Sequence, residues 1–232
     1  MKTIGLIGGM SWESTLTYYR LINESVKVRL GGLHSARIIL YSVDFHEIAQ
    51  LQKAGDWHAA GAQLIAAARS LQAAGADILL LCTNTMHKVA DEIQAAVNVP
   101  FLHIADATAQ EIRDAGIATV GLLGTRFTME EDFYRERLGS AQGLQVLIPG
   151  EADRETVHRV IYDELCLGQI SAASRAVFSR IMADLVARGA QGLVLGCTEI
   201  SLLVDQGDAS VPLFDTTSIH AHKAADWALG MA

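Results

Sequence analysis

Thr3-Ile-Gly-Leu-Ile-Gly8 is the stretch of sequence that decides the fold, because the chain contains it in two versions. The second version, Thr119-Val-Gly-Leu-Leu-Gly124, follows 116 positions later. Each version is a short apolar run that ends on glycine, which is typical of a strand in a parallel sheet. The sequence therefore predicts two related halves, each built on one such strand.

Two further matches occur in the same order along the chain. Cys82-Thr83-Asn84-Thr85 corresponds to Gly196-Cys197-Thr198-Glu199 at an offset of 114, and Val99-Pro100-Phe101 corresponds to Val211-Pro212-Leu213 at an offset of 112. Three matches at nearly one spacing indicate an internal pseudo-repeat.

Aliphatic runs alternate with Ala-rich amphipathic segments along the chain, which is typical of βα units with a parallel sheet. The strands are expected at residues 2–8, 36–43, 77–82, 100–103, 118–123, 144–148, 192–196 and 212–214. The helices are expected at residues 13–30, 57–74, 86–97, 105–115, 129–138, 152–166, 172–188 and 216–229. We predict an α/β fold of two pseudo-symmetric domains, each a parallel sheet flanked by helices. The first domain is expected to comprise residues 1–98 and 208–232, and the second residues 99–207.

Composition excludes several classes of protein. Of the 232 residues, 50% are apolar and 19% are charged, as in a compact globular protein. The net charge is −8 and the basic residues are scattered, which argues against a nucleic-acid partner. No uncharged run is long enough to span a membrane, and the short apolar start is a poor signal peptide. With three widely spaced cysteines, we expect a cytoplasmic protein with reduced thiols.

The pseudo-repeat also predicts where the site lies. Ligands of open parallel sheets bind beyond the carboxyl ends of the strands. With two such sheets, the site is expected in a cleft between the domains, where Thr83 would stand opposite Cys197.

Cys197 ends a strand at a Gly-Cys-Thr-Glu turn, where a following helix would lower the thiol pKa and make it a better base or nucleophile. A buried structural cysteine is the alternative. The backbone N–H groups near Asn84 and Thr85, and those near Thr198 and Glu199, are expected to face each other and form one pocket for a small carboxylate, with ordinary helix capping as the alternative. The hydroxyl groups of Thr125 and Thr128 could add donors.

The first strand leads into Gly8-Gly9-Met10, which lacks the spacing of a dinucleotide-binding loop. We expect a tight turn at which the backbone and Met10 approach a small ligand, with Ser11 capping the next helix. The loop after the second strand carries His46 without the second histidine of a zinc motif, so no metal is expected. Gln52 in that loop could reach a substrate carboxylate, or could simply be solvated.

Four motifs resemble those of the aspartate/glutamate racemase family. They are Ile4-Gly-Leu-Ile-Gly-Gly-Met10, Asn84-Thr85-Met86-His87, Leu122-Leu-Gly-Thr125 and Gly196-Cys-Thr-Glu199. The wider superfamily includes glutamate racemase, hydantoin racemase, maleate isomerase and arylmalonate decarboxylase. The resemblance implies a homodimeric amino-acid racemase without cofactor, in which a thiolate removes the Cα proton on one face and a thiol supplies one on the other. It also implies that the α-carboxylate binds backbone N–H groups near Asn84, Thr85 and Thr198.

The chain departs from the family at the first of the two cysteines. Family members read Cys-Asn-Thr, whereas Thr83 precedes Asn84 here, and Cys82 is expected to face away from the site unless the strand end bulges. We therefore expect Cys197 to be the base on one face and Thr83 a proton relay on the other. The resemblance implies a lysine for the distal carboxylate at the position of Cys166. Because this lysine is missing, the substrate could be aspartate, glutamate or a broader range of amino acids.

Two alternatives remain at this point. The first is chemistry by Cys197 alone, either decarboxylation or cis–trans isomerisation of a dicarboxylate. The second is a non-catalytic protein that binds an acidic amino acid. The candidate substrate-binding residues are Met10, Gln52, Asn84, Thr85, Thr125, Thr128, Thr198 and Glu199.

Overall fold

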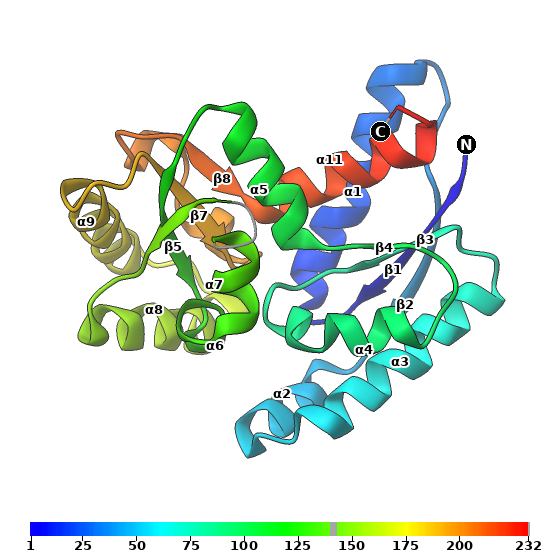
Figure 1. The fold of residues 1–232 in the computed structure, drawn as a ribbon, viewed down its shortest axis with the longest axis horizontal. Helices are drawn as coiled ribbons and strands as arrows, with labels where there is room; N and C mark the ends of the chain where they lie inside the picture. The colour runs from blue at the N-terminus through cyan, green and yellow to red at the C-terminus, as the bar shows by residue number, and fades with distance from the viewer. Residues whose placement is uncertain (140–142, 232) are drawn as a thin grey trace. The chain divides into compact units, whose positions relative to one another are not determined.

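The computed structural model describes residues 1–139 and 143–231. The chain divides into two compact units, the first comprising Met1–Ile104 and His220–Ala232 and the second Ala105–Ile219. Each unit contains one four-stranded sheet in which all paired strands are parallel (Figure 1). The predicted α/β class with two parallel sheets is confirmed.

The first sheet has the order β2-β1-β3-β4. Its strands are β1 (Thr3–Gly8), β2 (Arg37–Ser42), β3 (Ile78–Leu81) and β4 (Phe101–Leu102). Its helices are α1 (Trp12–Leu30), α2 (Phe45–Ala54), α3 (Trp57–Ala73), the 3₁₀ helix η1 (Thr85–Val89), α4 (Ala90–Ala95) and most of α11 (Thr216–Leu229). The apolar strand β1 lies in the middle and pairs with β2 on one side and β3 on the other.

The alternation of side chains along the central strands produces two cores, one on each face of the first sheet. Leu79 and Leu81 pack with α3 and α4, whereas Leu80 and Cys82 pack with α1 and α11. Figure 1 shows these two helical layers on opposite faces of the sheet. Burial on both faces explains why the strand sequences are almost wholly apolar.

The second sheet has the order β6-β5-β7-β8, which repeats the topology of the first. Its strands are β5 (Thr119–Gly124), β6 (Gln145–Leu147), β7 (Gly192–Gly196) and β8 (Leu213–Asp215). The other elements of this unit are α5 (Ile104–Asp114), α6 (Arg126–Glu130), α7 (Asp132–Leu138), α8 (Glu151–Asp163), η3 (Leu165–Leu167), α9 (Ala172–Ala187), α10 (Ile200–Leu203) and η4 (Gln206–Asp208). The match of strand order supports the pseudo-repeat found in the sequence.

The unit boundaries lie later in the chain than predicted. We expected the strand near 100–103 in the second domain, yet β4 pairs with β3 of the first sheet. The strand near 212–214 was expected in the first domain, yet β8 pairs with β7 of the second. The hydrogen bonds between paired strands therefore assign β4 to the first unit and β8 to the second. After β8, the chain returns to the first unit only from His220 onward, within α11.

The turn after β1 is as tight as predicted. Gly9 has a φ of +94°, and a Cβ atom there would lie 2.3 Å from the carbonyl oxygen of Val43. The Gly9 N–H donates to the hydroxyl of Thr15 at 2.8 Å, and the Ser11 hydroxyl caps α1 by accepting from the Ser14 N–H. Only glycine fits this combination of conformation and contact.

None of the helices among the described residues is long and apolar enough to cross a membrane.

Candidate active site

Cys197 lies directly after β7, and its thiol is paired with a carboxylate. The Sγ–H donates to Oε2 of Glu199 at 2.9 Å, and the Thr198 hydroxyl donates to the same oxygen at 2.8 Å. The three side chains are 7%, 4% and 2% exposed in chain order. Glycine on the neighbouring strand end permits this packing, because a Cβ on Gly124 would lie 2.8 Å from the carbonyl oxygen of Gly196. The turn therefore presents a buried thiol–carboxylate pair.

The electrostatics of this pair contradict the predicted lowering of the thiol pKa. Burial raises the pKa of the Cys197 thiol well above its ordinary value, and the negative charge of Glu199 raises it further. The expected helix dipole is weak, since α10 has only four residues. At neutral pH, Cys197 is therefore a neutral thiol that donates its proton to the carboxylate of Glu199 in a hydrogen bond.

Sequence reasoning missed Tyr162 at this site. Burial raises the pKa of Tyr162, and electrostatic interactions with Cys197, Cys166 and Glu199 raise it further, so these groups lie close enough to influence one another. Tyr162 lies on α8 and Cys166 on η3, both distant in sequence from the Gly-Cys-Thr-Glu turn. In the sequence, Tyr162 and Cys166 only belong to the helix that was expected at residues 152–166, and nothing in that pattern relates them to Cys197.

Thr83 lies at the equivalent position after β3 in the first unit. Its N–H donates to the carbonyl oxygen of Leu81 at 2.9 Å, which turns the chain sharply at the end of the strand. Its side chain is 9% exposed. Cys82 lies in the core packed against α1 and α11, and burial raises the pKa of its thiol far above the ordinary value. The expectation that Cys82 does not replace the missing family cysteine is consistent with this placement.

Asn84 is the N-cap residue of the 3₁₀ helix η1, which begins at Thr85, and both residues are buried. We expected a regular helix from residue 86, whereas the structure has a five-residue 3₁₀ helix followed by the short α4. The short helix reduces the dipole available to an anion at this end. Any carboxylate recognition here would depend mainly on the N–H groups themselves.

Gln52 was expected in a loop, but it lies in a helix. It lies on α2, which begins after Asp44 because the Asp44 carboxylate accepts from the His46 N–H. The Gln52 side chain is 5% exposed, and its amide Nε2 donates to Sδ of Met86 at 3.0 Å. Met10 is also buried and belongs to the same core cluster as Met86.

Thr125 and Thr128 form the cap of α6. The Thr125 hydroxyl accepts from the Thr128 N–H at 3.3 Å, and the two hydroxyl oxygens lie 3.2 Å apart. Thr128 is fully buried and packs against Gly124 and Gly196. The capping alternative therefore describes the pair better than the predicted role of Thr128 as a substrate donor.

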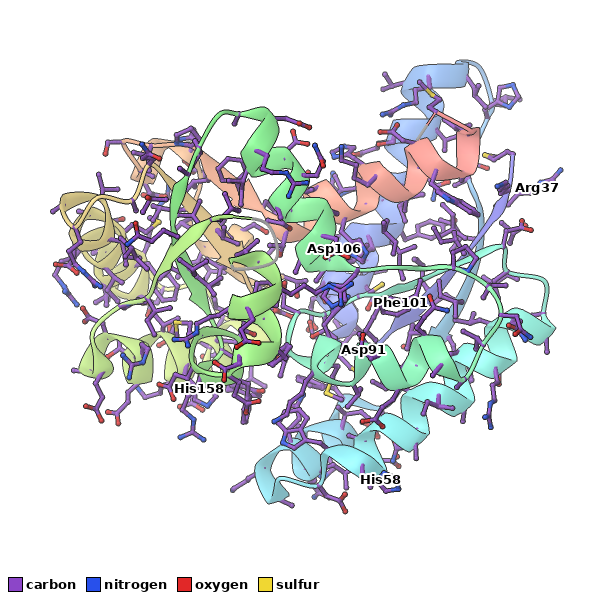
Figure 2. The ribbon with its side chains drawn as sticks, viewed as in Figure 1. Arg37, His58, Asp91, Phe101, Asp106 and His158 are labelled. Atoms are coloured by element: carbon purple, nitrogen blue, oxygen red, sulfur yellow. The ribbon has the colours of Figure 1, made fainter. Side chains whose placement is uncertain are left out.

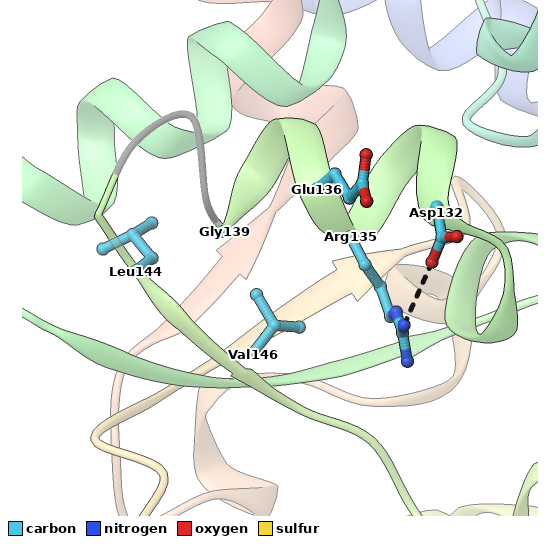
Figure 3. A pocket seen from close by; sticks show the side chains of 6 residues that line it. All are labelled: Asp132, Arg135, Glu136, Gly139, Leu144 and Val146. Atoms are coloured by element: carbon cyan, nitrogen blue, oxygen red, sulfur yellow. Dashed lines mark hydrogen bonds and ion pairs between the residues drawn. The ribbon is translucent and has the colours of Figure 1, made fainter.

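The second unit also has a hollow whose lining includes none of these residues. A hollow of about 360 Å³ beside α7 and β6 is shown in Figure 3. It is lined by Asp132, Arg135, Glu136, Gly139, Leu144 and Val146. Its main polar feature is the ion pair of Arg135 with Asp132 at 3.2 Å, which is solvent-accessible. Across residues 1–139 and 143–231, no three His, Cys, Asp or Glu side chains are grouped as metal ligands would be.

Comparison with known proteins adds independent information. The Asp/Glu/Hydantoin racemase family model matches residues 7–224. A crystal structure from Yersinia pestis, of a protein assigned to the Asp/Glu racemases, is 62% identical with a TM-score of 0.92, covering 99% of this chain and 100% of that one. The structure of an aspartate racemase homologue from Pyrococcus horikoshii OT3 is 38% identical with a TM-score of 0.85 and the same coverage.

A curated relative is the broad specificity amino-acid racemase RacX of Bacillus subtilis (strain 168). It is 26% identical over 165 residues, which cover 67% of this chain and 66% of RacX. The similarity to RacX therefore extends over about two thirds of each protein.

Proposed function

The chain belongs to the Asp/Glu/Hydantoin racemase family, and we propose that it is an amino-acid racemase that acts on an acidic amino acid without pyridoxal phosphate. One observation carries the proposal. A buried thiol–carboxylate pair, Cys197 with Glu199, follows β7, and Thr83 follows the topologically equivalent strand β3. Racemisation requires proton transfer on two faces of one carbon, and two equivalent strand ends provide two such groups.

Cys197 acts in both directions through Glu199. When it acts as a base, its S–H proton passes to Oε2 of Glu199, and the resulting thiolate takes the Cα proton and becomes a thiol again. When it acts as an acid, the thiol gives its proton to the Cα carbanion, and the resulting thiolate takes a proton from Glu199. Water restores Glu199 in both directions, because it removes the proton that Glu199 gains in the first case and supplies the proton that Glu199 passes on in the second. The 2.9 Å hydrogen bond is within the range that direct proton transfer requires.

Thr83 acts on the opposite face as a relay. Its hydroxyl passes a proton between the Cα carbanion and a water molecule, so that no free alkoxide accumulates. A hydroxyl is a far weaker acid than a thiol, which has a reference pKa of about 8.5. We therefore expect the Thr83 side to limit the rate of inversion, and the rates from the L and D enantiomers to differ.

The substrate is held by its carboxylates. We assign the α-carboxylate to backbone N–H groups at Thr85 and Thr198, as the family resemblance implies. For the distal carboxylate the candidate is Gln52, whose amide donates to the thioether of Met86. A thioether is a weak acceptor, so a charged carboxylate would compete for that donor effectively.

Chiral chromatography of reaction mixtures tests the proposal. Purified protein free of pyridoxal phosphate is incubated with L- and D-glutamate, L- and D-aspartate, and L-alanine as a neutral comparison. We expect the opposite enantiomer of an acidic substrate to form with the wild type and with Cys166→Ser, and to be lost in Cys197→Ser. Equal turnover of alanine would instead indicate a broad range like that named for RacX.

The rival functions predict other products. Release of carbon dioxide from a malonate, or interconversion of maleate and fumarate, would favour chemistry by Cys197 alone. A rise in melting temperature with glutamate, with no product at all, would favour a binding protein.

The assembly and location of the protein are further parts of the proposal. We propose a cytoplasmic homodimer, because none of the three cysteines forms a disulfide and the family resemblance implies a dimer. Light scattering coupled to gel filtration would give about twice the 24.9 kDa chain mass for a dimer.

A further inference from the structure

The imidazole of His87 connects two parts of the first unit that lie far apart in the sequence. Its Nδ1 lies 2.7 Å from the carbonyl oxygen of Thr83, and its Nε2 lies 3.2 Å from the backbone N of Ile104. The residue is 3% exposed. One buried ring therefore contacts both the exit of β3 and the first residue of α5.

The Thr83 carbonyl is available to this ring because of the 3₁₀ winding of η1. In an α-helix the His87 N–H would bond the carbonyl four residues back, which is that of Thr83. Here the His87 N–H donates instead to the carbonyl of Asn84 at 3.0 Å. The side chain of His87 thus takes the place that its own backbone N–H would occupy in an α-helix.

The two partners define one neutral tautomer of His87. A carbonyl oxygen can only accept, so Nδ1 carries the proton that bonds Thr83. The Ile104 N–H can only donate, so Nε2 is the unprotonated acceptor. Ile104 begins α5, and its N–H is one of the donors that a helix start leaves without a helical partner.

Aromatic neighbours surround the ring of His87. Its centroid lies 4.4 Å from that of His103, 5.6 Å from that of Phe101 and 6.0 Å from that of His220. Phe101, labelled in Figure 2, lies on β4 next to β3 in the sheet. Packing on several sides restricts rotation of the imidazole.

Both backbone polar groups of Thr83 are therefore fixed. Its N–H bonds Leu81, and its carbonyl bonds His87. With the peptide planes on either side held, the direction of the Cα–Cβ bond is set, and only rotation about χ1 remains to aim the hydroxyl.

We propose that His87 is a positioning residue that holds Thr83 in the orientation needed for proton relay. The inference rests on the proposed function, in which Thr83 serves one face of the substrate. If the Nδ1–H donor is removed, the buried carbonyl of Thr83 loses this hydrogen bond. Because an unsatisfied buried carbonyl is costly, we expect the backbone at Thr83 to move towards another donor. We expect inversion to slow by about tenfold, whereas proton exchange by Cys197 is spared.

Two substitutions distinguish the hydrogen bond made by Nδ1 of His87 from the one made by Nε2. In His87→Asn the amide N–H reaches the position of Nδ1 and preserves the bond to Thr83. In His87→Gln the amide reaches the position of Nε2 and preserves the bond to Ile104. A role in positioning Thr83 predicts that Asn rescues inversion and Gln does not.

The readout is the ratio of inversion to exchange in deuterated water. The enantiomer that still exchanges its Cα proton in Thr83→Ala identifies the face served by Cys197. From that enantiomer, His87→Gln should lower inversion relative to exchange by about tenfold, and His87→Asn should keep the ratio within about threefold of the wild type. Equal loss of inversion and exchange in His87→Gln would indicate a purely structural residue and overturn the inference.

A second readout does not depend on activity. In protein labelled with ¹⁵N-histidine, the His87 signals, assigned through their loss in His87→Gln, should show the Nδ1–H tautomer at neutral pH. An Nε2–H tautomer would overturn the positioning geometry directly. If the wild type shows the Nδ1–H tautomer but exchanges no substrate, the proposed function has failed, and the catalytic part of the inference fails with it.

Discussion

The thiol of Cys197 donates to the carboxylate of Glu199 across 2.9 Å, and both side chains are buried in the turn after β7. In this arrangement the proton is bound to the sulfur of Cys197, and the Glu199 carboxylate that can accept it lies within hydrogen-bond distance. A low thiol pKa is one way to obtain a reactive cysteine, and a paired base is another. The hydrogen bond from Cys197 to Glu199 is the geometry that the second way requires, and the proposed function relies on it.

Replacing Glu199 separates these two ways of activation. In Glu199→Gln the negative charge is gone, so the pKa of the Cys197 thiol falls and alkylation by iodoacetamide at pH 8 becomes faster than in the wild type. Turnover should nevertheless fall by about 10²-fold, because no carboxylate takes the thiol proton. Chiral chromatography and mass spectrometry measure the two effects.

The control for this variant is Glu155→Gln, which removes an exposed carboxylate of α8. It should change neither rate. Faster alkylation together with undiminished turnover in Glu199→Gln would contradict the role given to Glu199.

The three cysteines should react with iodoacetamide in a fixed order. Cys166 is partly exposed and reacts first, whereas Cys197 is buried with a raised pKa and reacts slowly. Cys82 is fully buried, and its thiol pKa is also raised, so it should react only when the protein unfolds. Peptide mapping by mass spectrometry gives each rate, and native labelling of Cys82 as fast as that of Cys166 would contradict its core position.

His220 should make the protein less stable in mild acid. Burial lowers its pKa from 6.5 to about 4, while Nε2 donates to the carbonyl of Leu102 and Nδ1 accepts from the Tyr18 hydroxyl. As the pH falls below 6.5, the unfolded chain binds a proton that the folded protein does not, so stability is lost progressively down to about pH 4. The loss between pH 7.5 and pH 5 should be about 2 kcal/mol.

Urea unfolding of the wild type and of His220→Gln at the two pH values tests this expectation. Glutamine can replace the donor to Leu102 but does not titrate. The variant should be less stable at pH 7.5 and should lose less stability on acidification. The same pH dependence in both proteins would show that His220 is not responsible.

Gly9 should tolerate no side chain. Its φ is +94° and a Cβ would lie 2.3 Å from the Val43 carbonyl oxygen, so Gly9→Ala combines an unfavourable backbone conformation with a steric clash. We expect a loss of about 3 kcal/mol in the free energy of unfolding. Gly32 also has a positive φ, of +57°, but has open space around it, so Gly32→Ala should cost only about 1 kcal/mol. Equal losses would contradict the close approach at Gly9.

Much of the fold could be predicted from the sequence because strand signals are local. Each of the eight strands in the described residues begins and ends within one residue of its expected bounds. Apolar runs with glycine at their ends are distinctive when both faces of a sheet are buried. The pseudo-repeat then related Thr83 to Cys197 without any tertiary information.

The features that were missed depend on long-range packing. Helix α2 is short and amphipathic, and the burial of Gln52 against Met86 reflects contacts that the local sequence does not specify. The thiol pKa was predicted in the wrong direction because a strand–turn–helix pattern reveals neither the length of α10 nor the side-chain conformation that brings Glu199 to Cys197. Assignment of β4 and β8 likewise needed their pairing partners.

The central claim is that Cys197 and Thr83 serve opposite faces of one Cα atom. Proton NMR of L- and D-glutamate in deuterated water tests it most directly, with the wild type, Thr83→Ala, Thr83→Cys and Cys197→Ser compared. We predict exchange and inversion in the wild type, exchange from a single enantiomer without inversion in Thr83→Ala, faster inversion in Thr83→Cys, and loss of inversion in Cys197→Ser. Undiminished inversion in Cys197→Ser, or in Thr83→Ala, would contradict the account.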